Sequence, residues 1–277
     1  KNQGDKYNAK ANEKEEDFRW KLKDALELYH KVIQDFPKSE GAEKCKVLKE
    51  EILKPSINLV AERFIAINSS SLLKVNYKNL NNLNFKIYKV SQKQLKDFNT
   101  TYDTDKKENI LNKLKVFKTF ESSLKNESDY QYHSTEIIIP KLENGLYLIK
   151  AETDSKQNAF AVSQIQITDF ALIESSTNNT QSFQLIDRNN GKPIVDANIK
   201  LTYVTNRDKS VTKTFTTNRY GKFNFQKDDN TLRNVSIIAN FNNEEGYFGD
   251  YYIYRYYDRT EDNDTEHNVF LFTDRSI

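Results

Sequence analysis

The hydrophobic period of this chain changes at Pro55, and that change restricts the fold more than any other feature of the sequence. Before Pro55, apolar side chains recur every three or four residues, which is the spacing of one face of an α-helix. Pro37 interrupts this pattern, and Ser39 stands where its hydroxyl can cap a second helix. The sequence therefore predicts a helical hairpin over residues 1–55 and a different architecture after it.

After Pro55, apolar and polar residues alternate, as in strands that bury one face. Residues 73–77 and 83–87 both alternate, and Asn79-Leu-Asn-Asn82 between them has turn chemistry, so this region is expected to form a β-hairpin. Strands 136–139 and 146–150 are expected to form a second hairpin about the turn Glu143-Asn-Gly145. Residues 91–98 and 106–114 have a helical or irregular pattern.

The strand and turn pattern restarts near Asp169 and continues to the end of the chain. At roughly 150 residues per domain, the length allows two domains. Several short strands separated by turn signals are typical of antiparallel sandwiches. We therefore expect a mainly β protein, with two antiparallel β-sandwiches over residues 56–168 and 169–277 after the helical hairpin.

Composition excludes several classes of function. Lys plus Arg is 42 and Asp plus Glu is 40, a balance that provides no strong global field for nucleic acid. No apolar run is long enough for a transmembrane helix. Cys45 is the only cysteine, and the three histidines are scattered, so no cofactor site and no catalytic constellation is visible. We predict that the chain is not an enzyme.

An aromatic tract near residue 250 is the most unusual local feature. Its interface candidates are Tyr251, Tyr252, Tyr254, Tyr256 and Tyr257. The favoured interpretation is a strand with one face on the core and the other on a neighbouring domain, because tyrosine suits strands and partly wet interfaces. The alternative is a stacking platform for sugars or bases.

For three further candidates, a purely structural interpretation is favoured over a functional one. Asp262, Asp264 and Glu266 supply alternating oxygen ligands for Ca²⁺, but they lack the spacing of an EF-hand, so a solvated loop is favoured. Cys45, at an apolar helical position, is expected to be a small buried side chain. His133 has no evident acid or base partner in the sequence and is assigned no catalytic role.

Four segments together carry a resemblance to a known family. They are Pro140-Lys-Leu-Glu-Asn-Gly-Leu-Tyr-Leu-Ile-Lys-Ala151, Asn190-Gly-Lys-Pro-Ile-Val-Asp-Ala-Asn-Ile-Lys-Leu201, Thr217-Asn-Arg-Tyr-Gly-Lys-Phe223 and Phe270-Leu-Phe-Thr-Asp-Arg-Ser-Ile277. In this order they resemble strands of bacterial α2-macroglobulin-like proteins, in which the last segment opens a further macroglobulin-like domain. Residues 25–39 resemble one tetratricopeptide repeat, although a solenoid needs about three.

The resemblance implies a function for the whole protein rather than for this chain alone. Members of the family trap or inhibit proteases, and bacterial members work at the cell envelope, in the periplasm or on the surface, as exported and often lipid-anchored proteins. Many carry a Cys-x-x-Gln thioester, which is absent here because Lys46, Val47 and Leu48 follow Cys45.

The expected role is therefore a non-catalytic scaffold segment. Its partners would be later domains of the same parent chain, and proteases through the full-length protein. The alternative is a surface adhesin or glycan-binding sandwich that uses the tract Tyr251–Tyr257.

Overall fold

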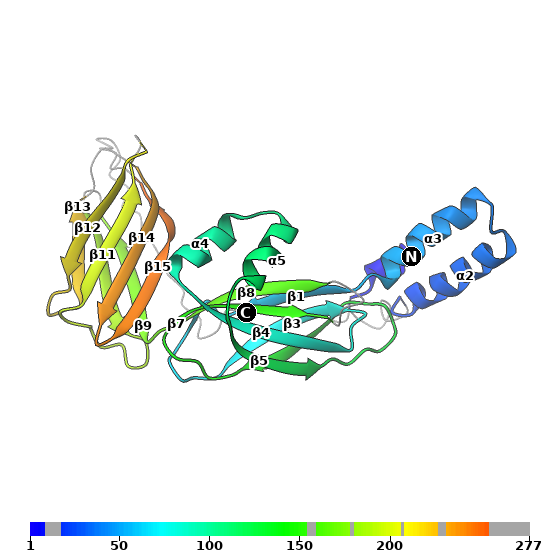
Figure 1. Cartoon of the computed structure of the whole chain (residues 1–277), viewed down its shortest axis with the longest axis horizontal. Coiled ribbons are helices and arrows are strands. Elements are labelled where there is room, and N and C mark those ends of the chain that lie inside the picture. The colour runs from blue at the N-terminus through cyan, green and yellow to red at the C-terminus, as the bar shows by residue number, and fades with distance from the viewer. Residues whose placement is uncertain (9–17, 154–158, 178–179, 206–207, 227–230, 255–277) are drawn as a thin grey trace, which may run out of the picture.

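The computed structural model describes residues 1–8, 18–153, 159–177, 180–205, 208–226 and 231–254. Figure 1 shows three parts in a row: a pair of helices at one end, a large sandwich in the middle and a smaller sandwich at the other end. The predicted class, mainly β with antiparallel sheets after a helical hairpin, is confirmed.

The amino-terminal part is a short 3₁₀ helix, η1 (Gly4–Lys6), and two antiparallel helices, α2 (Lys21–Asp35) and α3 (Glu40–Leu53). Ser39 caps α3 as expected, because its Oγ accepts a hydrogen bond from the N–H of Ala42 at 3.1 Å. The buried core of the pair is small and consists of Leu22, Ala25, Leu26 and Ile52. No described helix is both long enough and apolar enough to cross a bilayer.

The first sandwich pairs a three-stranded sheet with a five-stranded sheet. The smaller sheet has the order β1 (Ser56–Ala61), β3 (Ser71–Lys78) and β6 (His133–Ile139). The larger sheet has the order β2 (Phe64–Ile65), β8 (Phe160–Ile167), β7 (Gly145–Glu152), β4 (Asn82–Val90) and β5 (Val116–Ser123). The described pairings are antiparallel except that of β2 with β8.

Two short helices, α4 (Gln92–Thr100) and α5 (Thr104–Asn112), cover the outer face of the five-stranded sheet. Leu95, Phe98 and Leu111 of these helices pack on side chains of β4 and β7. The central strand β7 is therefore buried on both faces, from Leu146 to Ala151. This double burial explains why its sequence is nearly continuously apolar rather than alternating.

Both expected hairpins of the first sandwich are wrong. β3 pairs with β1 and β6, whereas β4 pairs with β5 and β7, so the two strands lie in opposite sheets. β6 and β7 are separated in the same way. Between β3 and β4, Asn79 has a φ of 56° and Leu80 is 2% exposed, so the connection crosses the edge of the core. Alternation shows that a strand has one buried face, and it does not identify the neighbour of that strand.

The second sandwich has a three-stranded and a four-stranded sheet. The first has the order β13 (Lys222–Gln226), β10 (Thr180–Asp187) and β9 (Phe170–Ser176), and the second has the order β12 (Ser210–Thr216), β11 (Asn198–Val204), β14 (Leu232–Phe241) and β15 (Glu244–Ile253). In its core the rings of Phe183 and Phe223 stack with centroids 5.0 Å apart.

Candidate functional site

The described side chains form two polar junctions, one at each end of the first sandwich. The hairpin joint consists of Arg19, Glu127, Asp129, Gln131 and His133, and it connects the helical pair with the loop between β5 and β6. The sandwich joint connects the two sandwiches through Glu244, Asn144 and their partners.

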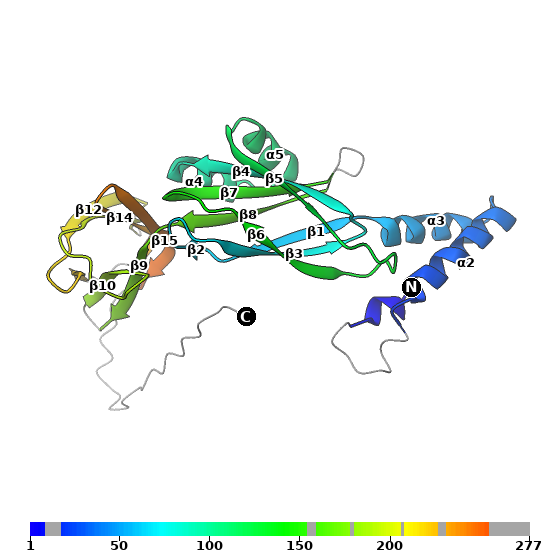
Figure 2. The same ribbon diagram turned by 90° about the horizontal axis from the view of Figure 1, so that it is seen from below.

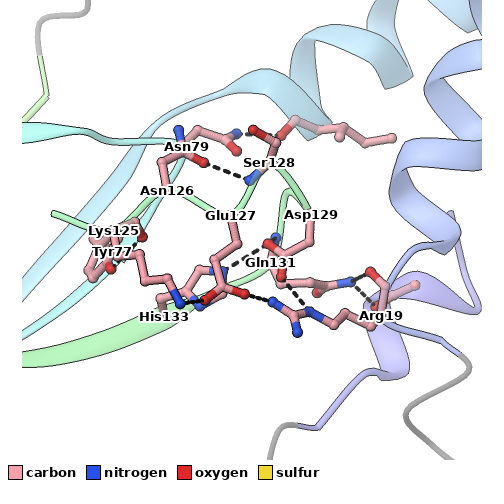
Figure 3. Close-up of polar contacts among 12 residues, drawn as sticks. Arg19, Tyr77, Asn79, Lys125, Asn126, Glu127, Ser128, Asp129, Gln131 and His133 are labelled. Carbon is pink, nitrogen blue, oxygen red and sulfur yellow. Dashed lines mark hydrogen bonds and ion pairs between the residues drawn. The ribbon is translucent and has the colours of Figure 1, made fainter.

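Asp129 is the centre of the hairpin joint, and its side chain is 1% exposed (Figure 3). Its Oδ2 accepts a hydrogen bond from Arg19 Nε at 2.9 Å, while Arg19 Nη2 forms an ion pair with Glu127. Its Oδ1 accepts from the N–H of Gln131 at 3.1 Å and lies 2.8 Å from His133 Nε2. The buried carboxylate is therefore surrounded by nitrogen donors, as a buried charge requires.

These donors also determine the acidity of Asp129. Burial by itself raises the pKa of a carboxyl group, because it disfavours the charged form. The hydrogen bonds from His133, from the backbone of Gln131 and from Arg19 outweigh burial, so the pKa of Asp129 lies below its ordinary value. The sequence pattern gave His133 no partner, and this expectation is corrected: the partner is Asp129, four residues earlier, across a turn.

The helical pair contacts the first sandwich at one end only, and Figure 2 shows both helices extending away from it. Gln131 Nε2 donates to the carbonyl oxygens of Gly4 and Arg19, each at 3.1 Å. Asn79 Nδ2 donates to the carbonyl oxygen of Ile52 at 2.8 Å, and Tyr130 packs on the small core of the pair. The attachment of the helical pair to the first sandwich is therefore end-on and largely polar.

The sandwich joint is formed where β8 leads into β9, opposite the turn between β14 and β15. Glu244 Oε1 accepts from Thr168 Oγ1 at 2.7 Å and from the N–H of Asp169 at 2.6 Å. Asp169 Oδ1 in turn accepts from the N–H of Ile67 at 2.9 Å. Burial is the main reason that the pKa of Glu244 is raised above its ordinary value.

A second set of contacts joins β15 to the first sandwich. Asn144 Nδ2 donates to the carbonyl oxygens of Ile167 and Glu245, both at 2.9 Å, and its Oδ1 accepts from the N–H of Glu245 at 3.0 Å. The rings of Phe64 and Phe248 stack across the joint with centroids 5.7 Å apart. Backbone and side-chain bonds in both directions fix the orientation of the two sandwiches.

The tyrosine tract is only partly in the described region. Tyr251 packs against the core of the second sandwich, and burial raises its pKa well above the ordinary value. Tyr252 and Tyr254 are 51% and 71% exposed. Tyr256 and Tyr257 lie outside the described residues, as do the Ca²⁺ candidates Asp262, Asp264 and Glu266. The interface role and the Ca²⁺ site both stay predictions.

The remaining candidates from the sequence are Cys45 and possible metal ligands. Cys45 is a free thiol and is partly exposed on α3, rather than fully buried as expected. Among the residues that the structure describes, no three His, Cys, Asp or Glu side chains are grouped so that they could hold a metal ion. Sequence reasoning missed both joints, because their partners are about a hundred positions apart in the chain.

No family model and no curated protein matches the sequence. Solved structures do match the fold. A crystal structure of native α2-macroglobulin from Escherichia coli spanning domains MG0-NIE-MG1 is 15% identical, with a TM-score of 0.53, over 71% of this chain and 64% of that one. A second, spanning NIE-MG1, is 14% identical with a TM-score of 0.50, over 71% of this chain and 97% of that one.

The chain thus matches less than two thirds of the longer fragment and almost all of the shorter one. Both matches extend over more of this chain than either sandwich alone. At this identity the likeness concerns the fold, and it agrees with the resemblance predicted from the strand motifs. This chain has the macroglobulin-like β-sandwich fold of the bacterial α2-macroglobulin fragments.

Proposed function

We propose that this chain is a non-catalytic scaffold segment of an α2-macroglobulin-like, protease-trapping protein of the bacterial cell envelope. The observation that carries the proposal is the sandwich joint, in which Glu244 and Asn144 bind backbone and side-chain groups of the opposite side. Such bonding holds two sandwiches in one orientation, which is what a protein needs if later domains must close around a captured protease.

Trapping itself requires steps that this chain does not supply. A trap needs a segment that the protease cleaves and, in many family members, an activated acyl group that captures the protease. The sequence contains no Cys-x-x-Gln motif, and we assign the cleavable segment to later parts of the parent protein. The partners of this chain are then those later domains, and proteases are partners of the whole protein.

The test compares the full-length parent protein with this chain alone. Each is incubated with several endoproteases, and residual activity is assayed on a small peptide substrate and on a large protein substrate. The parent should block cleavage of the large substrate and spare the small one, while the chain alone should change neither. Stoichiometric inhibition by the chain alone, or a covalent adduct with it, would contradict the scaffold role. Cell fractionation of the parent tests its location in the envelope.

A second candidate function rests on the exposed side chains of Tyr252 and Tyr254. Exposed aromatic rings can stack on sugars, so a glycan-binding sandwich remains the alternative. A glycan array with the native chain and the Tyr252→Ala/Tyr254→Ala variant distinguishes the two. Specific binding that the double variant loses would favour the alternative, and the absence of specific binding favours the scaffold.

A further inference from the structure

The outer face of the smaller sheet of the first sandwich carries exposed apolar side chains. Val60 of β1, Leu72 of β3 and Ile138 of β6 are 51%, 49% and 65% exposed. We call these three residues the outer patch. Their neighbours along the strands, such as Leu73 and Ile137, are buried in the core, and side chains alternate between the two faces of a strand. The three side chains of the outer patch therefore point away from the core.

The register of the strands brings these three residues together. Leu72 is directly opposite Ile138, and Val60 is opposite Lys74, which lies on the same face of β3 as Leu72. Opposite and diagonal neighbours on one face of a sheet are within reach of each other's side chains. The outer patch is therefore one apolar surface across three adjacent strands.

Among the described residues, the other outer sheet faces do not have large exposed apolar side chains on three adjacent strands. The larger sheet of the first sandwich is covered by α4 and α5, which Figure 2 shows on the side away from β1, β3 and β6. In the second sandwich, the outward hydroxyl groups of Thr202 and Thr212 lie 3.2 Å apart on the larger sheet, and on the smaller sheet the exposed Ile173 is opposite Gln184. An apolar patch on an otherwise solvated sheet face is typical of an interaction surface.

The chain itself contains a segment that suits the outer patch. Residues 268–273, Asn-Val-Phe-Leu-Phe-Thr, lie outside the described residues. When a segment is extended, side chains two positions apart lie on the same side, about 7 Å from each other. Phe270 and Phe272 have this spacing. Adjacent strands are about 4.8 Å apart, so two rings at this spacing match the width of a patch on three strands.

The chain is also long enough to bring this segment to the outer patch. Phe248 of β15 stacks on Phe64 at the sandwich joint, and the chain from Phe248 to Tyr254 extends about 20 Å further. Val60 is at most about 14 Å from Phe64 along the chain. The chain from Tyr254 to residue 268 can span about 45 Å, which is more than the path through these residues requires.

The small size of the outer patch favours a segment of the same chain over a second copy of the protein. A stable dimer of standard size buries roughly 800 Å² on each partner, and three half-exposed side chains supply much less. A segment of the same chain has an effective concentration on the order of millimolar when the length of its linker matches the span. A small apolar contact is therefore enough to hold it.

We propose that residues 268–273 dock on the outer patch, with Phe270 and Phe272 against Leu72 and Ile138. The docking removes apolar surface from water, and this burial stabilises the docked state. It holds the segment on the side of the first sandwich opposite α4 and α5. The docking does not depend on the protease-trap function, so either proposal can fail without the other.

The test is photo-cross-linking in the full chain. Ile138→p-benzoylphenylalanine places in the patch an aromatic ketone that, when excited, inserts into a nearby C–H bond, and mass spectrometry identifies the peptide that it joins. We expect a cross-link within one chain to the peptide that contains residues 268–273. The control is Val47→p-benzoylphenylalanine on α3, because Val47 is also 65% exposed, and it should not join this peptide. Cross-linked dimers from position 138, or no cross-link from it to residues 268–273, would overturn the proposal.

Two double variants identify the side chains that dock. Phe270→Ser/Phe272→Ser removes both rings and should lower the yield of the cross-link from position 138 several-fold. Val269→Ser/Leu271→Ser is the matched control, because it changes the opposite side of an extended segment and should leave most of the yield. Equal losses in the two double variants would overturn docking through the phenylalanine side.

Discussion

Arg19 Nε donates a hydrogen bond to the buried carboxylate of Asp129 at 2.9 Å, across 110 positions of the sequence. Arg19 lies just before α2, and Asp129 lies in the loop between β5 and β6. The contact attaches the helical pair to the first sandwich at a place where little apolar surface is shared. A small helical pair with so few buried side chains depends on such a tether for its orientation.

Replacing Asp129 should destabilise the chain more than replacing an exposed acid. Asp129→Ala removes the acceptor shared by Arg19, Gln131 and His133, and it leaves the buried N–H of Gln131 without this partner. We expect the free energy of unfolding to fall by about 2–3 kcal/mol, measured by urea denaturation. The control is Glu43→Ala, because Glu43 is exposed and its ion pair within the described residues is a surface pair with Lys46 on the same helix. Equal losses in the two variants would contradict the role of Asp129.

The low pKa of Asp129 predicts a stability change in acid. The folded-state pKa lies below the ordinary value of 3.8, so near that pH the unfolded chain binds the proton more readily. The stabilisation is therefore complete above about pH 5 and is lost as the pH falls through the ordinary value and then the folded-state pKa. The difference in unfolding free energy between the native chain and Asp129→Asn should be constant at neutral pH and shrink in acid. A difference that grows in acid would disprove this assignment.

Glu244 should be required for the fixed arrangement of the two sandwiches. Glu244→Ala removes the acceptor for Thr168 Oγ1 and the N–H of Asp169. We expect a loss of about 1–3 kcal/mol in unfolding free energy and a larger radius of gyration by small-angle scattering. Glu121→Ala, at an exposed position of the edge strand β5, should change neither quantity. An unchanged scattering profile for Glu244→Ala would show that other contacts suffice.

Two glycines with nearly the same φ separate backbone strain from steric overlap. Gly191 has a φ of 71° and no atom within 4 Å of a Cβ built there. Gly221 has a φ of 69°, but a Cβ there would lie 2.4 Å from the carbonyl oxygen of Leu185. Gly191→Ala should cost about 1 kcal/mol in unfolding free energy from its left-handed φ alone, and Gly221→Ala clearly more. Equal melting temperatures for the two variants would show that the predicted overlap between a Cβ at position 221 and the carbonyl oxygen of Leu185 has no effect on stability.

Removing the hydroxyl group of Tyr251 and removing that of Tyr147 should have opposite effects on the stability of the chain. Tyr251 Oη is buried without a hydrogen-bond partner among the described residues, so Tyr251→Phe should be neutral or stabilising. Tyr147 Oη donates to the carbonyl oxygen of Glu143 at 3.0 Å, and burial raises the pKa of Tyr147 to about 12. Tyr147→Phe should cost about 1 kcal/mol. Thermal melts of both variants check the pair, and a clear loss for Tyr251→Phe would contradict it.

Local pattern in the sequence was enough to locate most of the secondary structure. The three- and four-residue spacing before Pro55, with Ser39 as a cap, predicted α2 and α3, because helix formation and capping involve neighbours within one turn. Alternation predicted the strands for the same reason, since a strand with one buried face alternates whatever it pairs with. The order of motifs such as Pro140–Ala151 also pointed to the macroglobulin-like fold.

Tertiary structure alone decided which strands pair and where the joints lie. Strands β3 and β4 are adjacent in sequence but belong to opposite sheets, and the same alternation would suit a hairpin or a crossover. Arg19 with Asp129, and Asn144 with Glu245, meet across about a hundred residues. The strength of such pairs depends on burial and on exact distance, and the completed fold supplies both. Short-range spacing therefore determined the elements, and long-range packing determined the site.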